Sequence, residues 1–141
     1  MRRTLGLLLL VTALFGGYLW FTKPQPPVFK ALEAVRLDSI AATGRQLYGE
    51  LVFQNPNNLR VQLGELEFVA TINGIEIGTM KQEVSSGISK KETYRFPFRL
   101  RFSTDDIKVS KPYQIQIHGE ARSTTVLANY SVSFQGTSTI P

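Results

Sequence analysis

The chain has 141 residues, 43% of them apolar and 11% aromatic, which predicts one folded domain and excludes intrinsic disorder. It has no cysteine, so structural disulfides, thiolate zinc sites and cysteine nucleophiles are excluded. The net charge of +5 includes Arg2, Arg3 and Lys23, and the thirteen remaining Lys and Arg residues nearly balance eleven acids. This balance gives no indication of nucleic-acid binding.

Residues 1–23 are predicted to form an N-terminal membrane anchor. An apolar run from Leu5 to Phe21, interrupted only by Thr12, would extend about 26 Å as a helix, close to the thickness of a bilayer core. Positive charge before the run predicts a single-pass segment with a cytoplasmic N-terminus and a domain in the periplasm or another extracytoplasmic space. A cleaved signal peptide is the alternative, because Val11-Thr12-Ala13 fits a cleavage site.

Residues 24–33 are predicted to be a proline-rich linker, and residues 34–141 a β-domain with period-two patterning. Val35 and Leu37 begin the first expected strand. In the second, Leu47, Leu51 and Phe53 share one face. Asn55-Pro56-Asn57-Asn58 then predicts a turn, because proline lacks a donor and asparagine satisfies turns.

The apolar positions change parity across Gly64, which predicts a β-bulge in a third strand containing Leu66, Phe68, Ala70 and Ile72. Asn73-Gly74 follows and predicts a tight antiparallel hairpin. Ser85-Ser86-Gly87 predicts a loop before the next strand.

The last strands begin with an inward row of alternating residues: Tyr94, Phe96, Phe98, Leu100 and Phe102. Ser103-Thr104-Asp105-Asp106 predicts one helical turn. Two final strands are expected around Ile115 and Val132. About seven strands result, which predicts an all-β fold: an antiparallel β-sandwich like those of immunoglobulin and fibronectin III domains, preceded by one transmembrane helix.

The stretch from Leu51 to Asn57, LVFQNPN, and that from Thr71 to Gly78, TINGIEIG, resemble the late embryogenesis abundant (LEA) type 2, or water-stress and hypersensitive-response (WHy), domain. The resemblance covers residues 34–102 and implies a compact β-sandwich associated with stress protection, with no enzymatic chemistry. The matching motif residues are Asn55, Pro56, Asn57, Asn73 and Gly74. Their residue types favour a structural role in turns.

No constellation in the sequence indicates catalysis. His118 is the only histidine and is expected on an outer strand face, while Glu65 with Glu67 and Asp105 with Asp106 lack a partner base or nucleophile. No phosphate-binding loop follows a strand. The chain is therefore expected to be no enzyme and to need no cofactor or metal.

A basic stripe is predicted on the outer side of the strand that contains the inward aromatic row. It consists of Lys91, Arg95, Arg99 and Arg101. Such a stripe could contact anionic lipid or an acidic client protein, or could be a solvated face that resists edge pairing.

Together these features predict a non-catalytic, membrane-anchored domain that protects membrane or protein surfaces against desiccation and other stress. Two alternatives remain. One is an envelope binding module that holds a lipid or apolar ligand between its sheets, and the other is a structural subunit of an envelope complex.

Overall fold

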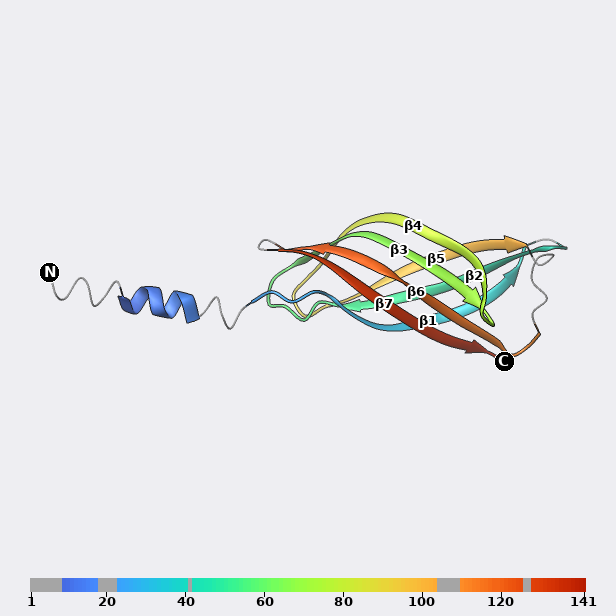
Figure 1. Ribbon diagram of the computed structural model, residues 1–141, viewed down its shortest axis with the longest axis horizontal. Helices are drawn as coiled ribbons and strands as arrows, with labels where there is room; N and C mark the ends of the chain where they lie inside the picture. The colour runs from blue at the N-terminus through green and yellow to red at the C-terminus, as the bar shows by residue number, and fades with distance from the viewer. Residues whose placement is uncertain (1–8, 18–22, 41, 104–109, 126–127) are drawn as a thin grey trace.

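The structure is a computed structural model that describes residues 9–17, 23–40, 42–103, 110–125 and 128–141 (Figure 1). Seven strands in this part of the chain form two antiparallel sheets. The three-stranded sheet has the order β1-β2-β5, with bounds Val28–Ser39, Gly44–Gln54 and Thr93–Ser103. The four-stranded sheet has the order β4-β3-β6-β7, with bounds Ile75–Ile88, Val61–Ile72, Tyr113–Thr124 and Asn129–Ile140. The predicted all-β class and seven strands are confirmed.

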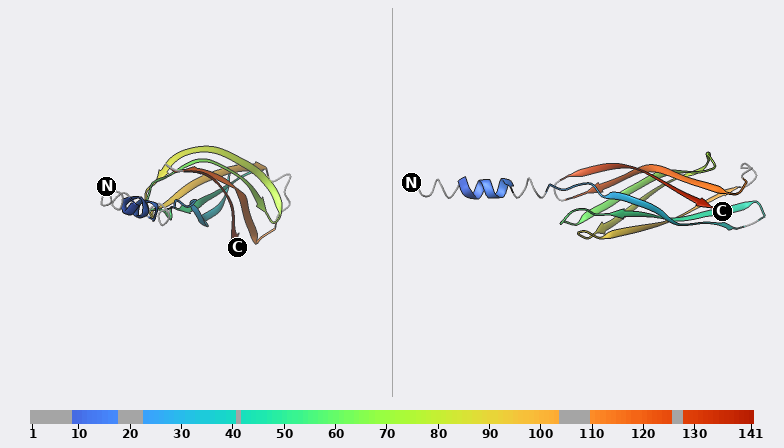
Figure 2. Two further views of the ribbon diagram at one scale, coloured as in Figure 1. Left: turned by 60° about the vertical axis from the view of Figure 1, so that its left-hand side comes forward. Right: turned by 90° about the horizontal axis from the view of Figure 1, so that it is seen from below.

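The two sheets pack face to face as a sandwich, and the four-stranded sheet arches over the three-stranded one (Figure 2). Aromatic rings join the layers: Phe68 and Phe98 have centroids 5.0 Å apart, and Phe134 lies 5.5 Å from Phe53 and 5.2 Å from Phe29. Edge-on and tilted ring pairs are favourable beyond the area that they bury. The core is therefore filled from both sheets.

The expected inward row of β5 is confirmed, since Phe96 and Phe98 are buried and Tyr94, Leu100 and Phe102 pack against the core. The Asn73-Gly74 hairpin is also confirmed. Ile72 pairs with Ile75, and Asn73 and Gly74 have φ angles of 49° and 82°. Positive φ at both central residues matches the twist of a two-residue hairpin.

The parity change at Gly64 is a bulge in β3, as predicted, because the register of β3 with β6 shifts between Leu63 and Leu66, where β3 has one residue more than β6. The prediction of a loop at Ser85-Ser86-Gly87 is wrong. These residues belong to β4, where Ser86 pairs with Leu63 and Ser85 has a φ of 48°. They adjoin a second bulge, which lies in β4 itself: between the pairs Leu63–Ser86 and Glu65–Glu83, β4 has one residue more than β3. The left-handed conformation of Ser85 fits such a bulge.

β1 begins at Val28, within the stretch 24–33 that the sequence suggested as linker. Its inward residues include Phe29 and Leu32. Register shifts follow Phe29 and Glu33, and Ala34 has a φ of 52°. These irregularities break the strict alternation, which is why the sequence pattern did not indicate the start of the strand.

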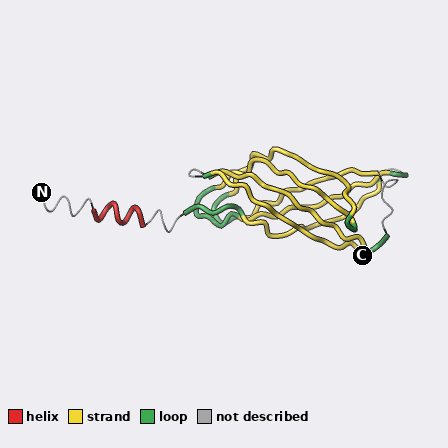
Figure 3. Tube along the Cα trace, in the orientation of Figure 1, coloured by secondary structure: helices red, strands yellow, loops and turns green. Residues whose placement is uncertain are grey.

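The described part of the N-terminal segment is a helix over residues 9–17 (Figure 3). At 1.5 Å per residue it extends about 14 Å, roughly half of a hydrocarbon core of about 30 Å. Among the described residues, no helix combines the length and the apolar character needed to cross a membrane. This finding contradicts the predicted single-pass anchor over residues 1–23 and the extracytoplasmic location that depended on it.

Candidate functional site on the outer faces of the sandwich

The outer side of β1, β2 and β5 gathers arginines around one tyrosine. The register places Arg36 and Arg99 on either side of Tyr48. Their guanidinium carbons lie 4.1 Å and 5.9 Å from the centroid of its ring. Both positions are within the range of a cation–π attraction. The cluster therefore depends on three strands, and two of them, β1 and β2, lie earlier in the sequence than the predicted basic stripe.

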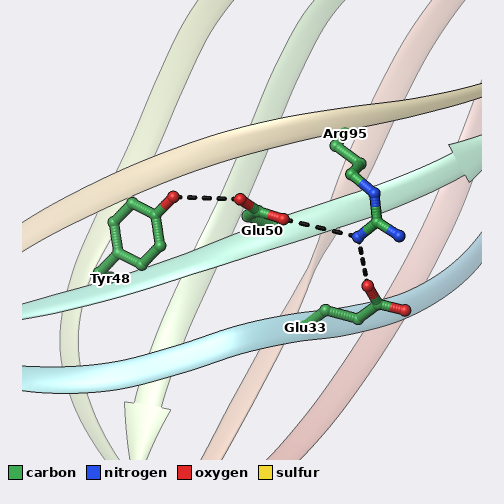
Figure 4. Close-up of polar contacts among 4 residues, drawn as sticks. All are labelled: Glu33, Tyr48, Glu50 and Arg95. Carbon is green, nitrogen blue, oxygen red and sulfur yellow. Dashed lines mark hydrogen bonds and ion pairs between the residues drawn. The ribbon is translucent and has the colours of Figure 1, made fainter.

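Arg95, the first stripe residue on β5, is compensated by carboxylates (Figure 4). Its Nη1 atom donates to Glu33 Oε2 and lies 3.5 Å from Glu50 Oε2, while Tyr48 Oη donates to Glu50 Oε1 at 3.2 Å. The hydrogen bond to Glu33 and the negative charge of that group raise the pKa of Arg95 above its ordinary value. Arg95 thus contributes little net positive charge to the outer face.

The remaining stripe residues lie in two different places. Arg99 and Arg101 are exposed on β5, and neither forms an ion pair with any residue that the structure describes. Lys91 precedes β5 and has a φ of 57°. Its ammonium group donates to the carbonyl of Pro56, so it belongs to the corner between strands rather than to the stripe.

Asn55 is completely buried at the corner that follows β2. Its Nδ2 atom lies 2.7, 3.0 and 3.1 Å from the carbonyl oxygens of Leu59, Ile88 and Ser89, and its Oδ1 atom accepts from the backbone N–H of Asn57 at 2.9 Å. Buried polar groups are stable only when they are hydrogen-bonded. One amide thus joins the corner to the end of β4.

Asn57 fixes the segment before β1. Its Oδ1 accepts from the backbone N–H of Gln25 at 2.6 Å, and its Nδ2 donates to the carbonyl of Gln25 at 2.6 Å. Tyr130 Oη donates to the carbonyl of Pro24 at 2.6 Å, and Pro27 is completely buried. Sequence reasoning missed this role, because turn preference says nothing of a partner thirty residues away.

At the other end of the sandwich, Asn73 does more than form a hairpin turn. Its Nδ2 donates to the carbonyl of Ser110 at 3.1 Å, and its Oδ1 accepts from the backbone N–H of Gln114 at 2.7 Å. The side chain is exposed and holds the start of β6. Gly74 supplies the second positive φ of the turn.

The residues considered for chemistry do not come together. His118 is exposed on β6, and Glu65 lies 3.6 Å from Lys81 Nζ and 3.7 Å from Arg122 Nη1. No group of three His, Cys, Asp or Glu residues suited to a metal occurs within the described parts of the chain. Asp105 and Asp106 lie outside them.

The outer side of β6 and β7 is a hydrogen-bonding layer that the sequence analysis did not predict. All its alternate positions are exposed and polar: Gln114, Gln116, His118, Glu120, Arg122 and Thr124 on β6, and Asn129, Ser131, Ser133, Gln135, Thr137 and Thr139 on β7. The six on β7 carry no charge. A shallow hollow of about 510 Å³ lies among His118, Glu120, Ser133 and Gln135. The signal was present in the alternation of Ser, Thr and Gln in the last strand.

No family model matches the chain, and no curated protein matches it. Several solved structures share its fold. A protein of Arabidopsis thaliana has 14% identity and a TM-score of 0.66, over 82% of this chain and 82% of that one. A protein provisionally described as late embryogenesis abundant has 10% identity and a TM-score of 0.59, over 99% and 87%.

A protein of Archaeoglobus fulgidus has 8% identity and a TM-score of 0.55, over 80% of this chain and 96% of that one. At such identities these likenesses show the fold alone. They agree with the resemblance in the Asn-Pro-Asn and Asn-Gly motifs: the chain has the LEA type 2, or WHy-like, fold.

Proposed function

We propose that this domain is a non-catalytic protection module that shields the surfaces of client proteins during water stress. The stress-related role rests on the LEA-like fold and on the motif resemblance. In this proposal the folded exterior, rather than an interior site, makes the contacts with the client.

The hydrogen-bonding layer on β6 and β7 is the observation that carries the proposal. A protein surface that loses its water leaves polar groups without partners, and each such group is costly. Ser, Thr, Asn and Gln side chains offer both donors and acceptors, and they do so without a net charge that would demand a counterion. The exposed residues of β7 present these groups in a regular row.

The packing of the core supports an exterior mode of action over a ligand held between the sheets. Phe53, Phe68, Leu51 and Leu63 are at most 1% exposed, and rings from opposite sheets are in contact. An acyl chain would have to displace these side chains, and interiors are packed too densely to admit one without rearrangement.

The classification of the sandwich as immunoglobulin- and fibronectin III-like is also part of the proposal. The orders β1-β2-β5 and β4-β3-β6-β7 can be matched to immunoglobulin-type strands A-B-E and C′-C-F-G. This correspondence supports the immunoglobulin- and fibronectin III-like topology expected from the sequence.

The test is to dry a desiccation-sensitive enzyme with the full chain and to measure the activity that survives rehydration. In one variant Ser131, Ser133, Thr137 and Thr139 become alanine. In a matched control, four exposed positions of β4 become alanine instead: Glu76, Thr79, Lys81 and Glu83. We expect the β7 variant to lose protection and the β4 variant to keep it. Equal protection by both variants contradicts the proposal.

A second candidate is contact with anionic lipid headgroups through Arg99 and Arg101, the two arginines of β5 without a carboxylate partner among the described residues. Sedimentation of the full chain with anionic vesicles should fall with salt and with the pair Arg99→Gln and Arg101→Gln. The control Arg95→Gln should change it little, because Glu33 and Glu50 already compensate Arg95. Binding that both variants reduce equally argues against this contact.

A further inference from the structure

A sandwich of two open sheets has four border strands, here β1 and β5 in one sheet and β4 and β7 in the other. Each border presents unpaired backbone groups that can template pairing with another chain. Proteins usually protect such borders with charges, prolines or bulges.

Three of the four borders carry these devices. β5 has three arginines and Pro97, and β1 and β4 each combine charged side chains with a bulge and a residue in the left-handed region. The charged residues are Lys30, Glu33, Arg36 and Asp38 on β1 and Glu76, Lys81 and Glu83 on β4.

β7 has none of them. Its sequence, NYSVSFQGTSTI, contains no charged residue and no proline, and its twelve residues pair with β6 without a register shift. β1 packs against its inner side through Phe29 and Leu32, but no ladder joins β1 to β7 in the described structure. Within the part of the chain that the structure describes, β7 is thus a long, uncharged border strand without a bulge, and no other strand pairs with its free edge.

We propose that β7 is a self-association site, at which two copies of this chain pair antiparallel, β7 to β7, to form a continuous eight-stranded sheet. A second copy is the partner that fits, because it supplies a strand of equal length and twist that is also free of charge. A two-fold axis makes such an interface self-complementary.

The side chains favour one register, with Gln135 on the two-fold axis. Ser133 of one copy then faces Thr137 of the other on the outer side, and hydroxyl pairs of this kind stabilise neighbouring strands. On the inner side Phe134 faces Gly136, so a large residue lies opposite the smallest one.

This register allows a charge-swap test on the full chain by sedimentation velocity over a range of concentrations. Ser133→Lys with Thr137→Lys places like charges opposite each other twice, and we expect the dissociation constant to rise about tenfold or more. Ser133→Lys with Thr137→Glu places opposite charges together twice and should restore association. Thr79→Lys on the β4 border is the control and should leave association unchanged.

Both β7 positions are exposed, so at concentrations where the parent chain is monomeric all variants should keep its thermal midpoint. The proposal is overturned if the parent chain is monomeric at every concentration, or if the two double variants associate equally.

Cross-linking gives an independent measurement, because the chain has no cysteine of its own. Under mild oxidation Gln135→Cys should form a covalent dimer much faster than Thr79→Cys, a similarly exposed position on the opposite border. Equal rates would contradict pairing through β7. Neither experiment depends on protection of a client, so self-association and the proposed function can fail separately.

Discussion

The two ends of the sandwich both use asparagine in a turn, but the two asparagines differ in burial and in reach. Asn55 is completely buried and its amide serves three carbonyls and a backbone N–H. Asn73 is exposed and bonds two backbone groups that water can also reach. The same residue type therefore contributes a different amount to the free energy of unfolding at each end, and the buried asparagine contributes more.

The largest expected effect is that of Asn55→Ala. It leaves buried carbonyls without donors, so we expect the free energy of unfolding to fall by about 3 kcal/mol, measured by urea denaturation. Asn58→Ala, at an exposed position of the same corner, is the control and should stay within about 0.5 kcal/mol. Similar losses of unfolding free energy in the two variants would show that the burial of Asn55 does not determine its contribution to stability.

Gly74→Ala tests the hairpin at the opposite end. The φ of Gly74 is 82°, and an L-residue in the left-handed region is destabilised by about 1–2 kcal/mol. Gly74→Asn should cost less, because asparagine tolerates this conformation, and urea denaturation of both variants measures the difference. An alanine variant as stable as the asparagine variant argues against the strain.

Asn57→Ala separates local from global effects at the corner. The variant loses both bonds to Gln25, so hydrogen exchange at the Gln25 amide should accelerate strongly while overall stability falls by about 1 kcal/mol. Tyr130→Phe removes only the bond to Pro24 and is the matched comparison. Unchanged exchange at Gln25 would mean that other contacts hold this segment.

Asn73→Ala should have the smallest effect, about 0.5 kcal/mol, because water replaces its bonds to Ser110 and Gln114. The change should appear mainly as faster exchange at the Gln114 amide. A loss as large as that of Asn55→Ala would show that exposure does not set the difference between the ends.

Much of the fold could be predicted because alternation marks which residues face inward. The rows around Phe96, Phe68 and Ile115, the bulge at Gly64 and the Asn73-Gly74 hairpin are all local patterns. The start of β1 and the continuation of β4 through Ser86 could not be predicted, since bulges alter the period and use the same small residues as loops.

The candidate site could be predicted only strand by strand. Alternation placed Arg95 outward, but its neutralisation depends on Glu33 and Glu50, which the register of two other strands brings to it. Similarly, the apolar run near the N-terminus indicated a spanning helix, whereas the described helix covers only residues 9–17.

The attachment of residues 24 and 25 to Asn57 and Tyr130 has a mechanical consequence. These residues lie at one end of the sandwich, and the C-terminal end of β7 lies at the other (Figure 1). A force applied between the two ends runs along the strands. Ladder hydrogen bonds are perpendicular to that direction, so β1 against β2 and β6 against β7 are loaded in shear, and many bonds resist together. The side-chain bonds of Asn57 and Tyr130 are the first that tension from the N-terminal side would reach.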